Sequence, residues 1–382
     1  MPAEPTSSAL SVRPVSGRRD IDRFIELPFR LHAASERWVP PLRFERRAFL
    51  SRKRNPYFAH AEVCLFLAER GERVVGRISA QVDSRWDTYQ GGNDGIFGFF
   101  ECEDDPEVAT ALLDAAADFV RSHGRDRLIG PMDFTMNDEC GLLVEGAERD
   151  PMVLEPWHPP YYQALIEGRG LTKTQDLFIW ELYFGQLRHG ESFHPLIHRA
   201  AEKSEQAGVR IRSMRRADMR AEVERFREVY NEAWGENWGF VPITEDEVDF
   251  QAANLKQILS EDWAMIAELD GEVVGAALTL PDYNQVFKRM NGRLLPFGWL
   301  KFLRWRRRIT DVRVFALGVK HAHQHLGVAA QLYVAQADMA AKLPQKGGDM
   351  GWTLESNKGM NRALEGMGGT VVKRYRIYEQ AL

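Results

Sequence analysis

Residues 312–342 place a strand-like segment, a glycine-containing loop and a helix-like segment in direct succession, and this order constrains the fold more than any other stretch. Val312–Val319 is apolar, and the apolar positions between residues 328 and 339 step by three or four, as on the buried face of a helix. The first backbone N–H groups of a helix have no partners within it, and the helix dipole favours negative charge there. Gly327 lets the main chain approach a ligand closely, and the loop contains no Asp or Glu. The arrangement therefore predicts a site for a phosphate group.

The spacing within this loop resembles the acyl-CoA loop of the GCN5-related N-acetyltransferase (GNAT) superfamily, in which Gln/Arg-x-x-Gly-x-Gly/Ala follows a strand ending in Val. Gln324, Gly327 and Ala329 match the three positions. A Walker loop is excluded because no Gly-Lys-Ser/Thr follows, and a dinucleotide fingerprint because Gly-x-Gly-x-x-Gly is missing. An ordinary strand–helix turn is the alternative. The resemblance implies that acyl-CoA is a cosubstrate bound by Leu317, Val319, Gln324, His325, Leu326, Gly327, Val328 and Ala329.

Two halves of the chain repeat a similar order of patterns. Each has a hairpin pattern containing Val-Val-Gly, at residues 62–82 and 263–280, and the Asp-Gly pair in the second is a strong turn signal. A chain of 382 residues is long for one core, so two domains are expected. We expect an α/β fold of two tandem GNAT-like domains, each with a mixed, mostly antiparallel central sheet flanked by helices. The predicted boundaries are 1–187 and 208–382, with a connecting helix within 188–207.

The second half carries the fuller pattern. Its expected elements are, in order, a strand, two helices, the hairpin, a strand, a helix, a strand, a short helix and a final strand pair around residues 370–378. The first half differs at residues 101–107, which contain five acidic residues and no Gly. Carboxylates there would repel a pyrophosphate, so we expect this half to lack a CoA site and to shape the substrate cavity. Residues 130–137 and 157–162 could line that cavity, or form rigid turns and core aromatics.

The resemblance also implies candidate catalytic and acceptor-binding residues. Asn357 matches the Asn that opens the helix after the fifth strand, and Glu355 at the strand end is a candidate general base. The alternative is that both cap the following helix. Leu364 stands where the family often has a Tyr as general acid, so the source of the proton for the thiolate is open. The candidate acceptor-binding residues, which core packing explains equally well, are Tyr230, Trp234 and Asn237.

Three histidines, His321, His323 and His325, alternate along the same loop. Alternate residues share a face only on a strand, and no Asp, Glu or Cys lies nearby, so we expect no metal site. Contact with phosphates is the favoured role, because partial protonation would assist anion binding below neutral pH.

Residues 284–310 form a basic and apolar insertion with eight Lys or Arg and no acid. Exposed on a helix, this composition suits an anionic membrane surface. A dimer or core contact and a contact with CoA or RNA are the alternatives. Together with Trp352–Met360 and Lys373–Tyr378, the insertion resembles the bacterial ceramide-synthase-like N-acyltransferases. That resemblance implies transfer of a fatty acyl group from acyl-CoA to the amine of a sphingoid base.

Composition limits the remaining classes of function. The net charge of −5 gives no reason to expect nucleic-acid binding, and three widely spaced cysteines suit a reducing cytosol. No secretory signal or spanning segment is evident, so we expect a cytoplasmic enzyme that could contact the inner face of the membrane. Two alternatives stay open at this point, an N-acetyltransferase for a small amine or peptide and a non-catalytic acyl-CoA-binding protein.

Overall fold

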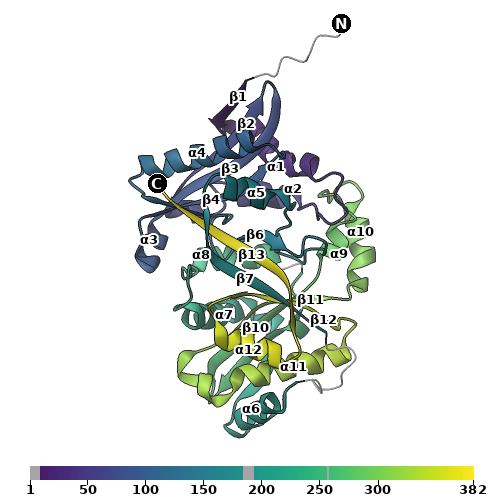
Figure 1. The fold of residues 1–382 in the computed structure, drawn as a ribbon. Coiled ribbons are helices and arrows are strands. Elements are labelled where there is room, and N and C mark those ends of the chain that lie inside the picture. The colour runs from purple at the N-terminus through teal and green to yellow at the C-terminus, as the bar shows by residue number, and fades with distance from the viewer. Residues whose placement is uncertain (1–8, 184–192, 256–257) are drawn as a thin grey trace. The chain divides into compact units, whose positions relative to one another are not determined.

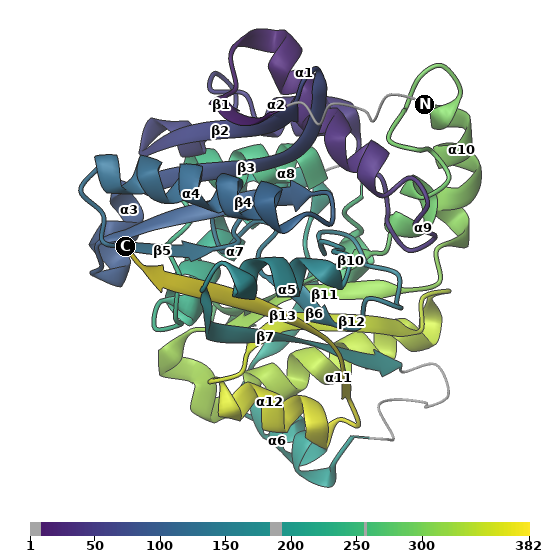
Figure 2. The same cartoon turned by 45° about the horizontal axis from the view of Figure 1, so that its top comes forward.

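The computed structural model describes residues 9–183, 193–255 and 258–382. The chain forms two compact units, and neither is continuous in sequence (Figures 1 and 2). The first unit contains residues 1–150, 156–176 and 375–382, and the second contains residues 151–155 and 177–374. The first unit therefore includes the C-terminal residues 375–382, and the second unit includes residues 151–155 from within the N-terminal half. The domain boundaries inferred from the order of the motifs stay a prediction.

The first unit is built on strands in the order β1-β2-β3-β4-β5 followed by the end of β13. Neighbouring strands are antiparallel, except that β4 and β5 are parallel. The strands are β1 (Leu10–Pro14), β2 (Ala61–Arg70), β3 (Arg73–Asp83), β4 (Asp94–Cys102), β5 (Arg127–Gly130), β6 (Leu142–Glu145) and β13 (Thr370–Ala381). The helices are α1 (Gly17–Leu31), α2 (Arg43–Phe49), α3 (Ser84–Gln90), α4 (Pro106–Ser122) and α5 (Tyr161–Gly168).

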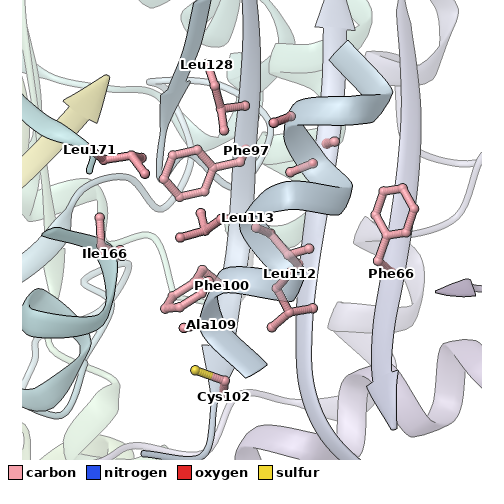
Figure 3. Packing of buried hydrophobic residues seen from close by; sticks show 14 of the residues in the cluster. Phe66, Phe97, Phe100, Cys102, Ala109, Leu112, Leu113, Leu128, Ile166 and Leu171 are labelled. Atoms are coloured by element: carbon pink, nitrogen blue, oxygen red, sulfur yellow. The ribbon is translucent and has the colours of Figure 1, made fainter. Parts of the chain in front are cut away.

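Helix α4 supplies one side of the core of this unit. Asp105 caps its start by accepting from the backbone N–H of Glu107, and Pro106 occupies the first helical position, where a missing N–H costs nothing. Figure 3 shows Leu112 and Leu113 of α4 among the buried side chains that pack against the strands.

In the first unit, the residues after β5 continue to hydrogen-bond with β4 beyond the end of the β4–β5 ladder. After the parallel ladder between β4 and β5 ends, the N–H of Met132 still donates to the carbonyl oxygen of Phe97 at 2.8 Å. The side-chain amide of Gln81 donates to the Met132 carbonyl at 3.1 Å. A Cβ atom at Gly98 would overlap that carbonyl, so a glycine is needed for the close approach.

The acidic residues after β4 bind arginines. Glu103 pairs with Arg30 and Arg73, while Asp105 and Glu107 pair with Arg70. The N-terminus of α4 therefore already carries negative side chains, Asp105 and Glu107, which would oppose a bound phosphate.

Glu101, at the end of β4, is the centre of a buried polar cluster. Its carboxylate accepts from Tyr162 at 2.7 Å and lies 2.7 Å from the ring nitrogen Nε2 of His32 and 3.6 Å from Arg77. Burial alone would raise the pKa of Glu101, but the attraction of His32 and Arg77 and the hydrogen bond from His32 outweigh it and lower the pKa to about 2.

The second unit is built on strands in the order β7-β12-β11-β10-β9-β8. The ladder between β11 and β12 is parallel, and the others are antiparallel. The strands are β7 (Thr172–Tyr183), β8 (Arg210–Ser213), β9 (Ala264–Leu269), β10 (Glu272–Pro281), β11 (Val312–Val319) and β12 (Gly347–Leu354). The helices are α6 (Pro195–Gln206), α7 (Met219–Trp234), α8 (Glu245–Leu255), α9 (Asn284–Phe287), α10 (Gly298–Trp305), α11 (Val328–Lys342) and α12 (Lys358–Gly366).

The elements predicted for the second half occur in the predicted order up to the last member, but α9 and α10 are inserted between the hairpin and β11. Asp270 and Gly271 have φ values of 52° and 86°, the left-handed conformations that a two-residue hairpin turn requires. At the start of α8, Thr244 and Glu247 form a reciprocal capping box. The predicted final strand pair is wrong, because residues 370–381 form one continuous strand. The predicted α/β class, with mixed and mostly antiparallel sheets, is confirmed.

Replacing Glu101 with Gln is expected to destabilise the protein by about 3–5 kcal/mol at pH 7, because it leaves the buried Arg77 without its counter-charge and removes the carboxylate that contacts His32. The pKa of Glu101 in the folded protein, about 2, lies below its ordinary value of 4.5. Ionised Glu101 therefore adds stability above pH 4.5, and this contribution is lost as the pH falls towards 2.

Urea unfolding followed by tryptophan fluorescence at pH 7, 5 and 3 measures both effects. Glu103→Gln is the matched control, since its ion pairs are partly exposed and contribute about 0–1 kcal/mol. Equal urea midpoints for Glu101→Gln and the wild type at pH 7 would contradict the assignment.

Candidate active site

The pairing between β11 and β12 stops partway along both strands. Val312–Val314 pairs with Gly348–Met350, whereas no residue pairs are formed between the rest of β11 and the rest of β12. A cavity of about 400 Å³ lies between these unpaired portions. It is lined by Ala233, Trp234 and Asn237, by residues 314–319, by Gln324, Ala329 and Tyr333, by residues 350–354, and by Asn357, Gly359, Met360, Ala363 and Leu364.

A buried group of charges lies where the two strands separate. Arg313 is directly opposite Asp349 in the last part of the ladder, and Lys373 contacts the carboxylates of Asp349 and Glu155. The Arg313 guanidinium donates to the Gly351 carbonyl at 3.1 Å. A carbonyl at the start of the gap thus receives a charge-assisted hydrogen bond from a side chain.

Helices α6 and α7 fix the loop between β11 and α11. Lys320 forms an ion pair with Glu228 of α7, and the backbone N–H of His321 donates to the Glu232 carboxylate at 3.1 Å. From α6, the Lys203 ammonium donates to the His325 carbonyl at 3.2 Å. The start of α11 is therefore held in place beside the cavity.

Four of the eight predicted acyl-CoA-binding residues line the cavity: Leu317, Val319, Gln324 and Ala329. His325, Leu326, Gly327 and Val328 are not part of its lining, and Val328 is fully buried in the core. Gly327 has a φ of 84°, and a Cβ atom there would overlap the carbonyl oxygen of Ala200 in α6. The structure thus requires glycine at 327 for the turn and for packing against α6.

Of the predicted acceptor-binding and catalytic residues, some line the cavity and others do not. Trp234, Asn237 and Asn357 line the cavity, and Asn357 also caps α12 by accepting from the N–H of Met360 at 3.1 Å. Tyr230 lies one turn before Trp234, with ring centroids 4.6 Å apart, and is not part of the lining. Glu355 is not part of the lining either. These roles stay predictions.

Tyr333, on α11, is a candidate that the sequence reasoning missed. Its side chain is buried and lines the cavity, and its hydroxyl donates to the thioether sulfur of Met360 at 3.0 Å. Burial raises the pKa of the Tyr333 phenol, which therefore stays protonated at neutral pH. Among the described residues that line the cavity, Tyr333 alone has an ionisable side chain. The available signal was a tyrosine directly after Leu332 on the helix that follows the loop.

The three histidines lie on a short 3-10 helix, His321–Leu326. His321 and His325 are exposed, and no set of three potential metal ligands was found within residues 9–183, 193–255 and 258–382. In the same ranges, no helix combines the length and the apolar character needed to cross a membrane.

Two sequence relatives align over nearly all of the chain. Bacterial ceramide synthase of Caulobacter vibrioides (strain NA1000 / CB15N) is 40% identical over 390 residues, which cover 100% of both chains. Protein YghO of Escherichia coli (strain K12) is 35% identical over 378 residues, covering 97% of this chain and 95% of that protein. No protein-family model matches the sequence.

The fold is similar to solved acyltransferase structures. A tandem GNAT protein from the clavulanic acid biosynthesis pathway has a TM-score of 0.59 and 13% identity, over 98% of both chains. A probable N-acyltransferase from Enterococcus faecalis V583 has a TM-score of 0.53 and 9% identity, over 98% of this chain and 73% of that chain. At these identities the likeness concerns the fold. The chain has the tandem GNAT fold, and it belongs to the family that contains bacterial ceramide synthase and protein YghO.

Proposed function

We propose that this protein is an acyl-CoA-dependent N-acyltransferase that transfers a long-chain acyl group to the amine of a sphingoid base. The observation that carries the proposal is the cavity between β11 and β12, which extends to the start of α11. It combines strand segments that do not pair with each other, a helix N-terminus and an apolar lining.

The acyl donor would bind along this cavity. On the side of β11 away from β10, backbone groups of residues 315–319 face a gap instead of a neighbouring strand, so they are available to the amides of a pantetheine arm. The pyrophosphate would lie at the start of α11, near Gln324 and Ala329, where the first helical N–H groups lack partners within the helix.

The chemistry requires a neutral amine and a proton for the leaving sulfur. The amine nitrogen attacks the thioester carbonyl carbon, the C–S bond of the tetrahedral intermediate breaks, and the thiolate takes a proton from the Tyr333 hydroxyl. The tyrosinate then regains a proton lost by the former amine nitrogen. An apolar cavity lowers the pKa of a bound amine by desolvation, which favours its neutral form. Glu355 as a general base stays an alternative.

A lipid acceptor is supported by two observations. Cavity residues such as Trp234, Phe315 and Leu364 are apolar, and the relative that is 40% identical is named a ceramide synthase. Both substrates of the proposed reaction are amphiphiles, so the reaction would take place at the inner face of a membrane.

Thiol release measured across acyl-CoAs of increasing chain length tests the function. With a sphingoid base as acceptor, long-chain acyl-CoA is expected to release thiol faster than acetyl-CoA, with the N-acyl product identified by mass spectrometry. Faster release with acetyl-CoA and a small amine would instead identify an acetyltransferase. Acyl-CoA binding without thiol release from any acceptor would identify a non-catalytic binding protein.

Ala329→Glu tests the phosphate position. The new carboxylate would lie in the first turn of α11, where it opposes a pyrophosphate but suits the helix dipole. We expect acyl-CoA affinity to fall roughly 10- to 100-fold, about 1.4–2.8 kcal/mol, with no loss of thermal stability. Calorimetric titration measures the affinity.

Ala329→Gln is the matched control, since it adds similar volume without charge. Equal losses in both variants would indicate a steric effect, and unchanged affinity in Ala329→Glu would place the pyrophosphate elsewhere.

Tyr333→Phe tests the source of the proton. Removing the hydroxyl is expected to lower kcat by roughly 10²-fold or more, with the KM for acyl-CoA changed only a few-fold, because the proton is needed when the C–S bond breaks. Tyr378→Phe, which removes the hydroxyl of another buried tyrosine outside the cavity lining, is the control. A kcat near that of the wild type in Tyr333→Phe would assign the proton to another donor.

A further inference from the structure

A cluster of exposed apolar side chains lies around α10. Leu295, Phe297, Trp299, Leu300 and Leu303 are 73%, 68%, 45%, 48% and 47% exposed. These five are half of the ten large apolar side chains that are exposed across the described residues. In both views of the ribbon, α10 lies at the outer edge of the second unit (Figures 1 and 2). Exposed apolar side chains gathered on one short segment are typical of an interaction site.

Helix α10 is anchored through its opposite face. Phe302 stacks on Tyr283 with ring centroids 5.5 Å apart, and Trp305 lies beneath the guanidinium of Arg289 at 4.3 Å. Gly298 is buried, and the carbonyl of Arg293 occupies the space where a side chain would lie. The helix is therefore packed on its own unit already, and the exposed residues form a second face.

The exposed face is compact. Because successive residues of a helix are turned by about 100°, Trp299, Leu300 and Leu303 fall within an arc of about 100°. Lys301 and Arg304 lie on the helix beyond one edge of this arc. The result is an apolar strip bordered by cations.

The charge around the strip is opposite in sign to that of the whole chain. Residues 284–310 contain eight Lys or Arg and no acid, whereas the chain has a net charge of −5. Arg293, Lys301, Arg304 and Arg306–Arg308 are all exposed. Cations beside exposed Trp and Leu match the two parts of an anionic bilayer surface, the headgroups and the start of the acyl chains.

We propose that residues 293–308 form a membrane-docking surface for anionic lipid bilayers. Leu295, Phe297, Trp299, Leu300 and Leu303 enter the interface, while the arginines and Lys301 contact lipid phosphates. Helix α10 has eight residues, so it lies along the surface. The inference extends the proposed function, because docking would bring the cavity to a supply of lipid substrates, but binding to vesicles requires no catalysis.

Co-sedimentation of the full chain with vesicles tests the surface. Vesicles of phosphatidylcholine alone are compared with vesicles containing about one third phosphatidylglycerol, at low and at high salt. We expect at least tenfold tighter binding to the anionic vesicles, and weaker binding in high salt. Leu300→Asp/Leu303→Asp should lose binding, and Arg304→Gln/Arg306→Gln/Arg307→Gln should lose the preference for anionic lipid.

Phe44→Asp/Tyr89→Asp is the matched control, because both side chains are exposed and apolar but lie in the first unit. It should bind vesicles as the wild type does. Brominated lipid should quench tryptophan fluorescence in the wild type and less in Trp299→Phe, which reports insertion directly.

Three results would overturn the proposal. They are absence of wild-type binding to anionic vesicles, unchanged binding by Leu300→Asp/Leu303→Asp, and self-association of the wild type that this variant abolishes in the absence of lipid. The last result would assign the strip to a contact between copies.

Thiol release with a short, soluble amine separates this proposal from the function. Normal release by Leu300→Asp/Leu303→Asp is expected. If the wild type does not bind vesicles but releases thiol, only the docking surface is wrong. If it binds vesicles but releases no thiol from any acyl-CoA, only the function is wrong.

Discussion

The end of the pairing between β11 and β12 is the constraint on which the rest of the second unit depends. Two parallel strands that stop pairing leave backbone groups that need other partners. Arg313 supplies one at Gly351, and the backbone groups of residues 315–319 on the side away from β10 face the cavity. In the first unit, the N–H of Met132 stays paired with the carbonyl oxygen of Phe97 beyond the end of the ladder between β4 and β5. The two units thus differ in whether the backbone stays hydrogen-bonded where their parallel strands separate.

The lining of the cavity limits what the protein can contribute to a reaction. Tyr333 is a weak acid that burial keeps protonated, and it is the one ionisable side chain among the described lining residues. In the proposed reaction, such a site would position the two reactants, exclude water and supply a proton, while its described lining residues include no carboxylate. Under the proposed function, the apolar cavity lowers the pKa of the bound amine. Desolvation thus favours the neutral, nucleophilic amine that a general base would otherwise have to produce.

Local patterns predicted much of the fold, because they depend on neighbours in sequence. The Asp270–Gly271 turn follows from two adjacent residues. The sequence predicted the loop before α11. It could not show that Gly327 is required for packing, because the contacting residue, Ala200, belongs to a helix more than 120 residues earlier. The charges at 155, 313, 349 and 373 meet only in the folded chain, so no spacing could reveal them. Periodicity identified the core side of α11, but not that Tyr333 borders a cavity.

The C-terminal residues 375–382 belong to the first unit, which has a consequence for folding during synthesis. Tyr378–Ala381 completes the first sheet by pairing with Arg127–Gly130, about 250 residues earlier in the sequence. At a synthesis rate of about 5–20 residues per second, the edge of β5 waits roughly 10–50 s for its partner strand. An unpaired strand edge is a template for aggregation during that time. Pairing with residues 378–381 covers this edge of β5.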